Sequence, residues 1–142
     1  MFLGEYEYKV DAKGRVPLPP KFRRQFAEGI VLNMGPDNQI NGYTVNDWDT
    51  NSEKFDFGPI AKSKQREMTR AFFGSAFDLE LDSQGRIMLP PTLRRDAGIK
   101  ESLVIIGANK CIEIWGKERW DKAKGDARAN LYRHYESMEM RQ

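Results

Sequence analysis

The sequence predicts an α+β fold built from two similar halves of about 70 residues each. The main observation is an internal repeat: residues 11–25 align without gaps to residues 82–96, and eight of the fifteen positions are identical. Apolar and charged residues alternate before each copy, which is typical of a β-strand, and large apolar residues at helical spacing lie within each copy. Shorter matches outside these segments extend the repeat across both halves.

Each half is expected to open with a half-buried strand. Apolar side chains such as Tyr6 and Tyr8 alternate with charged ones over residues 5–10, and the same alternation recurs over residues 77–82. A period of two places successive side chains on opposite faces of a strand. One face of each opening strand is therefore expected to pack against the core.

The motif Asp-x-x-Gly-Arg follows each opening strand and predicts a tight turn. Asp11 and Asp82 are placed to accept hydrogen bonds from the following backbone amides, and Gly14 and Gly85 are expected to have a positive φ. The two aspartates could also form a carboxylate pair for acid–base chemistry or metal binding, but a structural role in each turn explains both. We expect each turn to join its flanking strands into a hairpin.

A return strand and a short helix follow each turn. Residues 15–18 and 86–89 place apolar side chains on one side and Arg15 or Arg86 on the other. A proline pair ends each return strand and favours the first turn of a helix, where a missing amide donor is harmless. Pro17 indicates an edge or bulged position, because proline cannot donate a hydrogen bond to a ladder.

A second pair of strands comes next in each half. Residues 30–33 and 43–45 are the apolar stretches of the first half, and residues 103–106 and 112–115 are those of the second. Turns that contain glycine and asparagine separate the members of each pair. This pattern predicts two further hairpins.

The remaining segments are expected to form two helices and a loop. Large apolar residues recur at helical spacing over residues 62–73 and 120–138. The polar segment 49–58 has no clear period, and we expect it to be the loop between the halves. The sequence thus predicts a first repeat at residues 1–70 and a second at residues 71–142, packed together as one compact unit.

The composition excludes several classes of protein. One cysteine, Cys111, and one histidine, His134, exclude an intrachain disulfide and a Cys/His zinc site. No apolar run reaches the roughly 20 residues that a membrane span needs. No phosphate-binding loop or dinucleotide motif is present. We therefore expect a cytoplasmic protein that is not an enzyme, binds no cofactor or metal and does not associate with membranes.

Basic residues are concentrated in the first copy of the repeat. The net charge of the whole chain is only +2, but residues 11–25 carry +4, whereas residues 82–96 carry +1. Basic side chains beside a turn suit the DNA phosphate backbone, and arginine can bind guanine O6 and N7 through two hydrogen bonds. The candidate DNA-binding residues are Lys13, Arg15, Lys21, Arg23, Arg24 and Arg86.

Alternatives stay open for these basic residues. Solvated charges around a turn would explain one copy, but Arg15 and Arg86 are shared by both copies beyond what turn and core require. Arg23 and Arg94 are also shared, and a salt bridge to the turn aspartate or to a neighbouring subunit explains them as well as DNA does. The alternative function is a non-DNA interaction or scaffold module. For DNA binding, we expect the first copy to make most contacts and the second to serve in assembly.

The chain resembles the bacterial MraZ family at these same residues. The resemblance lies in the opening Phe2-Leu-Gly-Glu-Tyr and in Asp-x-x-Gly-Arg followed by Leu-Pro, at residues 11–19 and again at residues 82–90. It covers the chain essentially from end to end. The resemblance implies two AbrB-like swapped-hairpin half-units that form a pseudo-symmetric double-split β-barrel with flanking helices.

The resemblance also implies a function. It suggests a transcriptional regulator of the division and cell-wall gene cluster that binds direct repeats in double-stranded DNA upstream of its own gene. A ring-shaped homo-oligomer in the cytoplasm and nucleoid, without enzymatic activity or cofactor, is expected. Short strands and a small core in each half independently favour assembly, and a ring would engage several DNA repeats at once.

Overall fold

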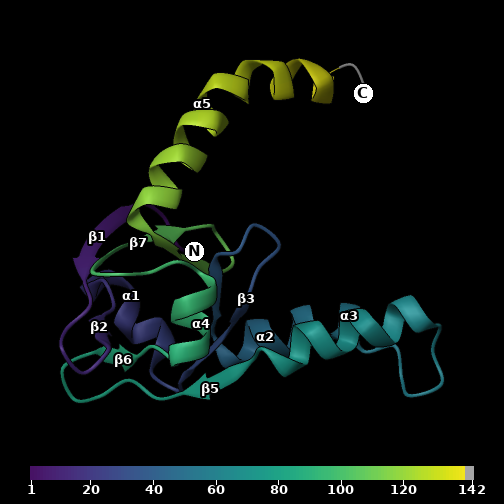
Figure 1. Ribbon diagram of the computed structural model, residues 1–142, viewed down its shortest axis with the longest axis horizontal. Helices are drawn as coiled ribbons and strands as arrows, with labels where there is room; N and C mark the ends of the chain where they lie inside the picture. Colours follow the sequence, from purple (N-terminus) through teal and green to yellow (C-terminus); the bar gives the residue numbers. More distant parts are fainter. Residues whose placement is uncertain (140–142) are drawn as a thin grey trace.

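The computed structural model describes residues 1–139 and has an α+β architecture, which confirms the predicted fold class (Figure 1). Its strands are β1 (Glu5–Lys9), β2 (Arg15–Pro17), β3 (Ile30–Met34), β4 (Ile40–Tyr43), β5 (Phe77–Leu79), β6 (Arg86–Met88), β7 (Ser102–Gly107) and β8 (Ile112–Gly116). Its α-helices are α1 (Pro20–Arg23), α2 (Val45–Ser52), α3 (Ser63–Gly74), α4 (Pro91–Asp96) and α5 (Lys117–Glu139). Short 3₁₀-helices, Arg24–Phe26 and Glu53–Phe55, follow α1 and α2.

The opening strands of the two repeats are exchanged within a six-stranded antiparallel sheet. The strand order is β1-β7-β8-β4-β3-β5. β1 of the first repeat pairs with β7 of the second, so that Glu5 lies opposite Ile106. β5 of the second repeat pairs with β3 of the first, so that Leu79 lies opposite Ile30. The predicted hairpins β3–β4 and β7–β8 are present, and each receives its additional strand from the other repeat. The predicted strand at residues 43–45 is wrong in its bounds, because β4 ends at Tyr43 and Val45 begins α2.

The two return strands form a separate ribbon. β2 pairs with β6, with Val16 opposite Ile87. The prediction that each return strand pairs with its own opening strand is therefore wrong. Exchange of the opening strands gives the outer edges of β3 and β7 a partner, and unpaired strand edges are costly. The ribbon has two strands, so β2 pairs on one side only and is an edge strand. Pro17 therefore lies in an edge position, as the sequence indicates.

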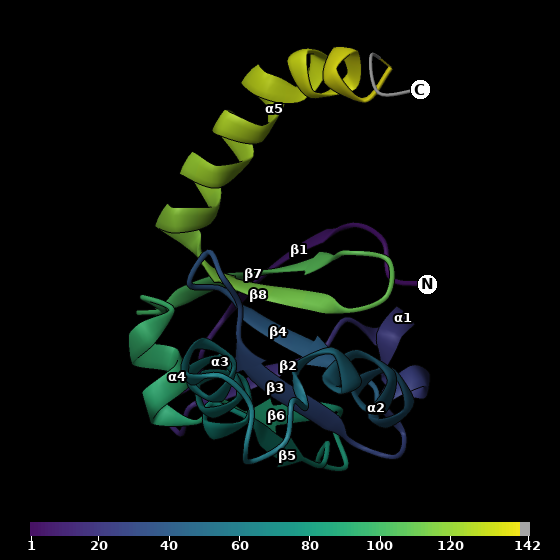
Figure 2. The ribbon, with the colours of Figure 1, turned by 90° about the vertical axis from the view of Figure 1, so that its right-hand side faces the viewer.

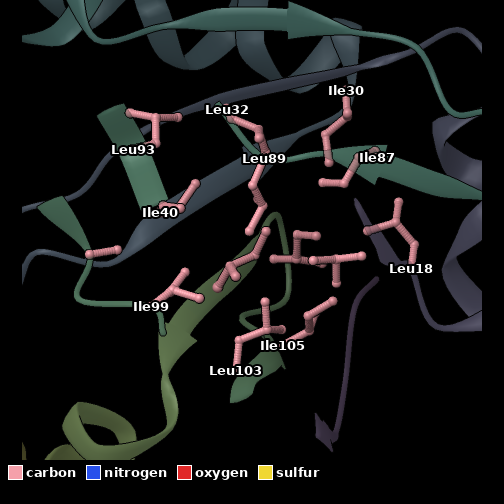
Figure 3. Packing of buried hydrophobic residues seen from close by; sticks show 14 of the residues in the cluster. Leu18, Ile30, Leu32, Ile40, Ile87, Leu89, Leu93, Ile99, Leu103 and Ile105 are labelled. Carbon is pink, nitrogen blue, oxygen red and sulfur yellow. The ribbon is translucent and has the colours of Figure 1, made fainter. Parts of the chain in front are cut away.

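A hydrophobic core lies between the ribbon and the inner face of the large sheet (Figure 3). Val16 and Ile87 reach it from the ribbon, and Leu32 and Ile105 reach it from the sheet. All four side chains are at most 1% exposed. The core thus contains residues of both repeats and positions the two turns that flank the ribbon.

The short helices begin where the proline pairs predict. α1 starts at Pro20 and α4 at Pro91, so the first helical residue is one whose missing N–H breaks no hydrogen bond. Phe22 of α1 and Leu93 of α4 are buried in the core. Gly98 follows α4 with a φ of +67°, a conformation that glycine adopts without strain.

Helices α2 and α3 lie together beside β3 and β4 (Figure 2). The prediction of a loop at residues 49–58 is wrong, because α2 and the following 3₁₀-helix occupy most of this segment. Thr44 caps α2 by accepting a hydrogen bond from the backbone N–H of Asp47 at 3.2 Å. Trp48 stacks on Phe72 of α3, with ring centroids 4.9 Å apart. This contact between distant segments supplies the burial that the polar local sequence does not reveal.

Helix α5 leaves the sheet and extends away from the rest of the molecule (Figures 1 and 2). Its first turns are held by Trp120, which packs on Trp115, and by Lys117, which pairs with Glu7 at 3.1 Å. Within residues 1–139 neither α5 nor another helix is long and apolar enough to cross a membrane. The outer part of α5 carries large apolar side chains that are at least half exposed: Leu131, Tyr132, Tyr135 and Met138.

Candidate nucleic-acid interface

The first turn is closed by both oxygens of one aspartate. Asp11 Oδ1 accepts hydrogen bonds from the backbone N–H groups of Lys13 at 2.9 Å and Arg15 at 2.8 Å. Asp11 Oδ2 accepts a hydrogen bond from Arg15 Nε at 2.7 Å, which is also an ion pair. Gly14 has a φ of +82° and donates its N–H to the carbonyl of Asp11. A single carboxylate thus fixes the backbone and orients the arginine.

The second turn repeats this geometry. Asp82 Oδ1 accepts from the backbone N–H groups of Gln84 and Arg86, each at 2.9 Å. Asp82 Oδ2 accepts from Arg86 Nε at 2.8 Å, and Gly85 has a φ of +74°. The motif Asp-x-x-Gly-Arg therefore encodes one local structure in both halves.

These hydrogen bonds lower the pKa of both aspartates. The backbone N–H of Arg15 is the largest cause for Asp11, and the Arg15 guanidinium and the Lys13 amide add to it, so that the pKa falls from 3.8 to about 2. The backbone N–H of Arg86 is the largest cause for Asp82, whose pKa is also lowered. At neutral pH both aspartates are ionised and hold their arginines.

The ribbon binds the two turns to each other. The carbonyl of Gly85 accepts the N–H of Leu18 at 3.0 Å, and the carbonyl of Gly14 accepts the N–H of Leu89 at 3.0 Å. Each turn is therefore attached to the return segment of the other repeat. The two turns form one unit and cannot move independently without the loss of these hydrogen bonds.

Arg15 and Arg86 lie on the face of the ribbon opposite the core, because the neighbouring Val16 and Ile87 are buried. Their side chains are 29% and 25% exposed. Contrary to the prediction from the sequence, Arg15 and Arg86 are part of what the turns require, since each one closes its own turn through its aspartate. Only the Nε donor is used in this way, and a guanidinium has four further N–H donors on its terminal nitrogens.

Arg23 and Arg94 hydrogen-bond to the backbone rather than to the turn aspartates. Arg23 Nε donates to the carbonyl of Leu18 at 2.9 Å, and Arg94 Nε donates to the carbonyl of Ile99 at 3.2 Å. Within residues 1–139 neither arginine forms a salt bridge to a turn aspartate, whereas the salt bridge to a neighbouring subunit stays a prediction. Both arginines instead fix the segments that flank their helices.

The other predicted DNA-binding residues, Lys13, Lys21 and Arg24, are exposed. Lys13 lies beside Arg94 and Arg95 of α4, in a cavity between the first turn and the second repeat. Arg95 was not among the predicted site residues. Counting charge along the sequence could not find this neighbourhood, because the pairing of β2 with β6 creates it.

Residues with other possible chemistry lie elsewhere. His134 is exposed on α5. Cys111 is half-buried just before β8, and burial raises the pKa of its thiol to about 11, which leaves the thiol protonated at neutral pH. In the described part of the chain, no three Cys, His, Asp or Glu side chains are grouped closely enough to hold a metal ion.

Comparison with known proteins recovers the same repeat. A family model described as "MraZ protein, putative antitoxin-like" matches residues 1–71 and again residues 72–142. The chain belongs to the MraZ family. Each of the two MraZ matches contains one turn and one exchanged opening strand. The junction between the matches lies within α3, as does the predicted junction between residues 70 and 71.

Curated MraZ proteins are similar over nearly their full length. A transcriptional regulator MraZ from Dehalococcoides mccartyi is 40% identical over 140 residues, which cover 98% of this chain and 99% of the relative. Another, from Lactobacillus delbrueckii subsp. bulgaricus, is 42% identical over 127 residues, or 89% of each chain. A third, from Acetivibrio thermocellus, is 38% identical over 140 residues, which cover 99% of this chain and 98% of the relative. All three relatives are named as transcriptional regulators.

Proposed function

We propose that this protein is a transcriptional regulator that binds double-stranded DNA through the two ribbon turns and acts by binding rather than catalysis. The observation that carries the proposal is the aspartate–arginine pair in each turn. The carboxylate holds the arginine in one orientation and leaves its terminal nitrogens available. A preoriented guanidinium suits bidentate hydrogen bonding to guanine O6 and N7. The names of the relatives support the regulatory role.

The proposed contact surface comprises basic residues of both turns and of the segment after the first turn. Arg15 and Arg86 are assigned to base edges, because they are held by aspartates on the outer face of the ribbon. Lysine and arginine side chains around them are assigned to the phosphate backbone. These residues are the exposed Lys13, Lys21 and Arg24, together with the half-buried Arg23.

We further propose the assembly and the target that family membership suggests. Residues 1–70 and 71–142 act as two repeats of one AbrB-like double-split β-barrel, and the chain forms a ring-shaped homo-oligomer. The exposed apolar side chains of α5 support assembly, since contiguous apolar surface favours protein contacts. The proposed target is a set of direct repeats upstream of the protein's own gene, within the division and cell-wall cluster, and the proposed location is the cytoplasm and nucleoid.

The test is a gel shift with DNA from the region upstream of the protein's own gene, compared with random DNA of equal length at matched salt. We expect retention of the upstream DNA at protein concentrations that leave random DNA free. Equal binding of both DNAs would reduce the proposal to non-specific electrostatic binding. Absence of binding to either would favour the alternative of a non-DNA interaction module.

A further inference from the structure

Two cavities lie at equivalent places on either side of the ribbon. The first turn faces α4 of the second repeat across a cavity of about 460 Å³. The second turn faces α1 and the following 3₁₀-helix of the first repeat across a cavity of about 610 Å³. Because β2 and β6 are antiparallel, each cavity combines the turn of one repeat with the helix of the other.

The two cavities have opposite charge. Three basic residues and no acidic residue line the first cavity, namely Lys13, Arg94 and Arg95. One basic residue, Arg23, and three acidic residues line the second, namely Glu28, Glu80 and Asp82. Three cations with no acidic side chain beside them in the cavity wall repel one another, so the first cavity favours an anion and the second does not.

The backbone of the two turns also differs in access. A Cβ atom built at Gly14 would have no other atom within 4 Å, so the first turn is open. A Cβ atom at Gly85 would overlap Nε and Cδ of Arg23, so the second turn is covered. Arg94, which is equivalent to Arg23 in the repeat, turns instead toward the carbonyl of Ile99 and leaves Gly14 free.

We propose that the first cavity is a binding site for a backbone phosphate of DNA, built from the first turn and α4 together. Lys13 and Arg95 supply the free charge, and Arg94 adds positive potential while it holds the backbone after α4. Arg95 forms an ion pair with Asp96 at 3.6 Å, but this distance is too long for a hydrogen bond and both side chains are exposed, so the pair is weak. Arg95 therefore remains able to bind a phosphate oxygen.

This inference rests on the proposed function. It assigns a DNA contact to α4, although the low net charge of the second copy of the repeat had favoured a role in assembly. It also adds α4 to the part that the second repeat has in binding through Arg86. The phosphate contact fixes position on the duplex and carries no sequence information. Arg95 is thus expected to affect specific and random DNA to the same extent.

The test is a salt-resolved fluorescence anisotropy titration of full-length protein with a duplex from upstream of its own gene. We expect Arg95→Ala to weaken binding about tenfold and to lower the slope of log affinity against log salt by about one per site. The matched control is Arg70→Ala on α3, an exposed arginine that makes no ion pair within residues 1–139, and it should bind as the wild type does. Each variant is first shown to keep the wild-type oligomer size and melting temperature.

A double variant tests whether the site is shared. If Lys13 and Arg95 bind one phosphate, Lys13→Ala combined with Arg95→Ala should lose less affinity than the product of the two single losses. A loss equal to that product would overturn the shared cavity. If Arg95→Ala binds the duplex as tightly as the wild type does, this inference is overturned but the proposed function is not. If the wild type binds no duplex, the proposed function is overturned as well.

Discussion

At the scale of single residues, the turn aspartates connect folding with the presentation of arginine. Asp11 and Asp82 each accept two backbone hydrogen bonds and one from an arginine side chain. The sequence pattern was sufficient to place these aspartates and the glycines of the turns. It was not sufficient to show that the arginine is part of the same turn, because the ion pair depends on the path of the backbone after the glycine.

The lowered aspartate pKa values predict a loss of stability in acid. Asp11 has a pKa of about 2 in the folded protein against 3.8 in the absence of these interactions, and the pKa of Asp82 is shifted in the same direction. Protons therefore bind the unfolded state more readily, so the contribution of these groups is complete above about pH 4 and is lost as the pH falls toward 2. Urea unfolding between pH 5 and pH 2 should show this decline, and it should be shallower for Asp11→Asn. An equal decline in the variant would contradict the assignment.

The turn glycines should tolerate no β-branched residue. Gly14→Val places a β-branched side chain at a positive φ, and we expect a loss of about 1–3 kcal/mol in the free energy of unfolding. Gly85→Val should lose more, because Arg23 occupies the space that the side chain would need. Urea unfolding of both variants measures the difference. Gly125→Ala, in the open interior of α5, is the control and should be neutral or slightly stabilising; wild-type stability of both valine variants would contradict the turn geometry.

Arg15 should contribute more to DNA binding than Arg86. Its turn is open and lies beside the basic cavity, whereas the turn of Arg86 is covered by Arg23 and lies beside acidic residues. We expect Arg15→Ala to cost about 1–3 kcal/mol of discrimination between specific and random DNA per engaged subunit, and Arg86→Ala to cost less. The measurement is a salt-resolved titration of variants that retain their oligomer size. A greater loss for Arg86→Ala would assign the principal contact to the second turn.

At the scale of elements, the sequence predicted most helices and strands but not their partners. Alternating apolar residues identified the opening strands, and the proline pairs located the starts of α1 and α4. Strand exchange could not be derived from local pattern, because β1 would present the same alternation to either repeat. Helix α2 was missed for a related reason: Trp48 is half-buried and stacks on Phe72, which lies more than twenty residues away in the sequence.

Strand exchange predicts that neither half folds alone as a monomer. A fragment of residues 72–142 would contain β5 without its partner β3, and β7 without its partner β1. We expect such a fragment to be unfolded or to associate through its open edges, because its core would lack the residues of the first repeat. Circular dichroism and size-exclusion chromatography check this outcome. A monomeric fragment with a cooperative thermal transition would show that the second repeat is autonomous.

At the scale of the whole molecule, we expect α5 to determine how copies of the chain associate. Its outer turns are exposed and carry large apolar side chains, whereas its first turns are held against the sheet. We expect light scattering at micromolar concentration to report a homo-oligomer larger than a dimer. Tyr135→Glu should lower the oligomer mass that light scattering reports without changing the melting temperature, because the side chain is 57% exposed and contributes little to the core.

Lys64→Glu on α3 is the control for the change in charge, since Lys64 is also exposed but belongs to a polar stretch. The Lys64→Glu variant should keep the oligomer mass of the wild type. A wild-type protein that remains monomeric would remove the basis for multivalent DNA binding. Retention of the full mass by Tyr135→Glu would place the contact between subunits on another surface.

The difference between the open turn at Gly14 and the covered turn at Gly85 has an evolutionary consequence. Separate single-repeat chains that paired as a dimer would carry every substitution twice, so a side chain that covered one turn would cover both. Fusion of two copies into one gene removes that constraint. The two turns can then change independently, so that one stays open while a side chain covers the other, and each chain supplies one turn of each kind.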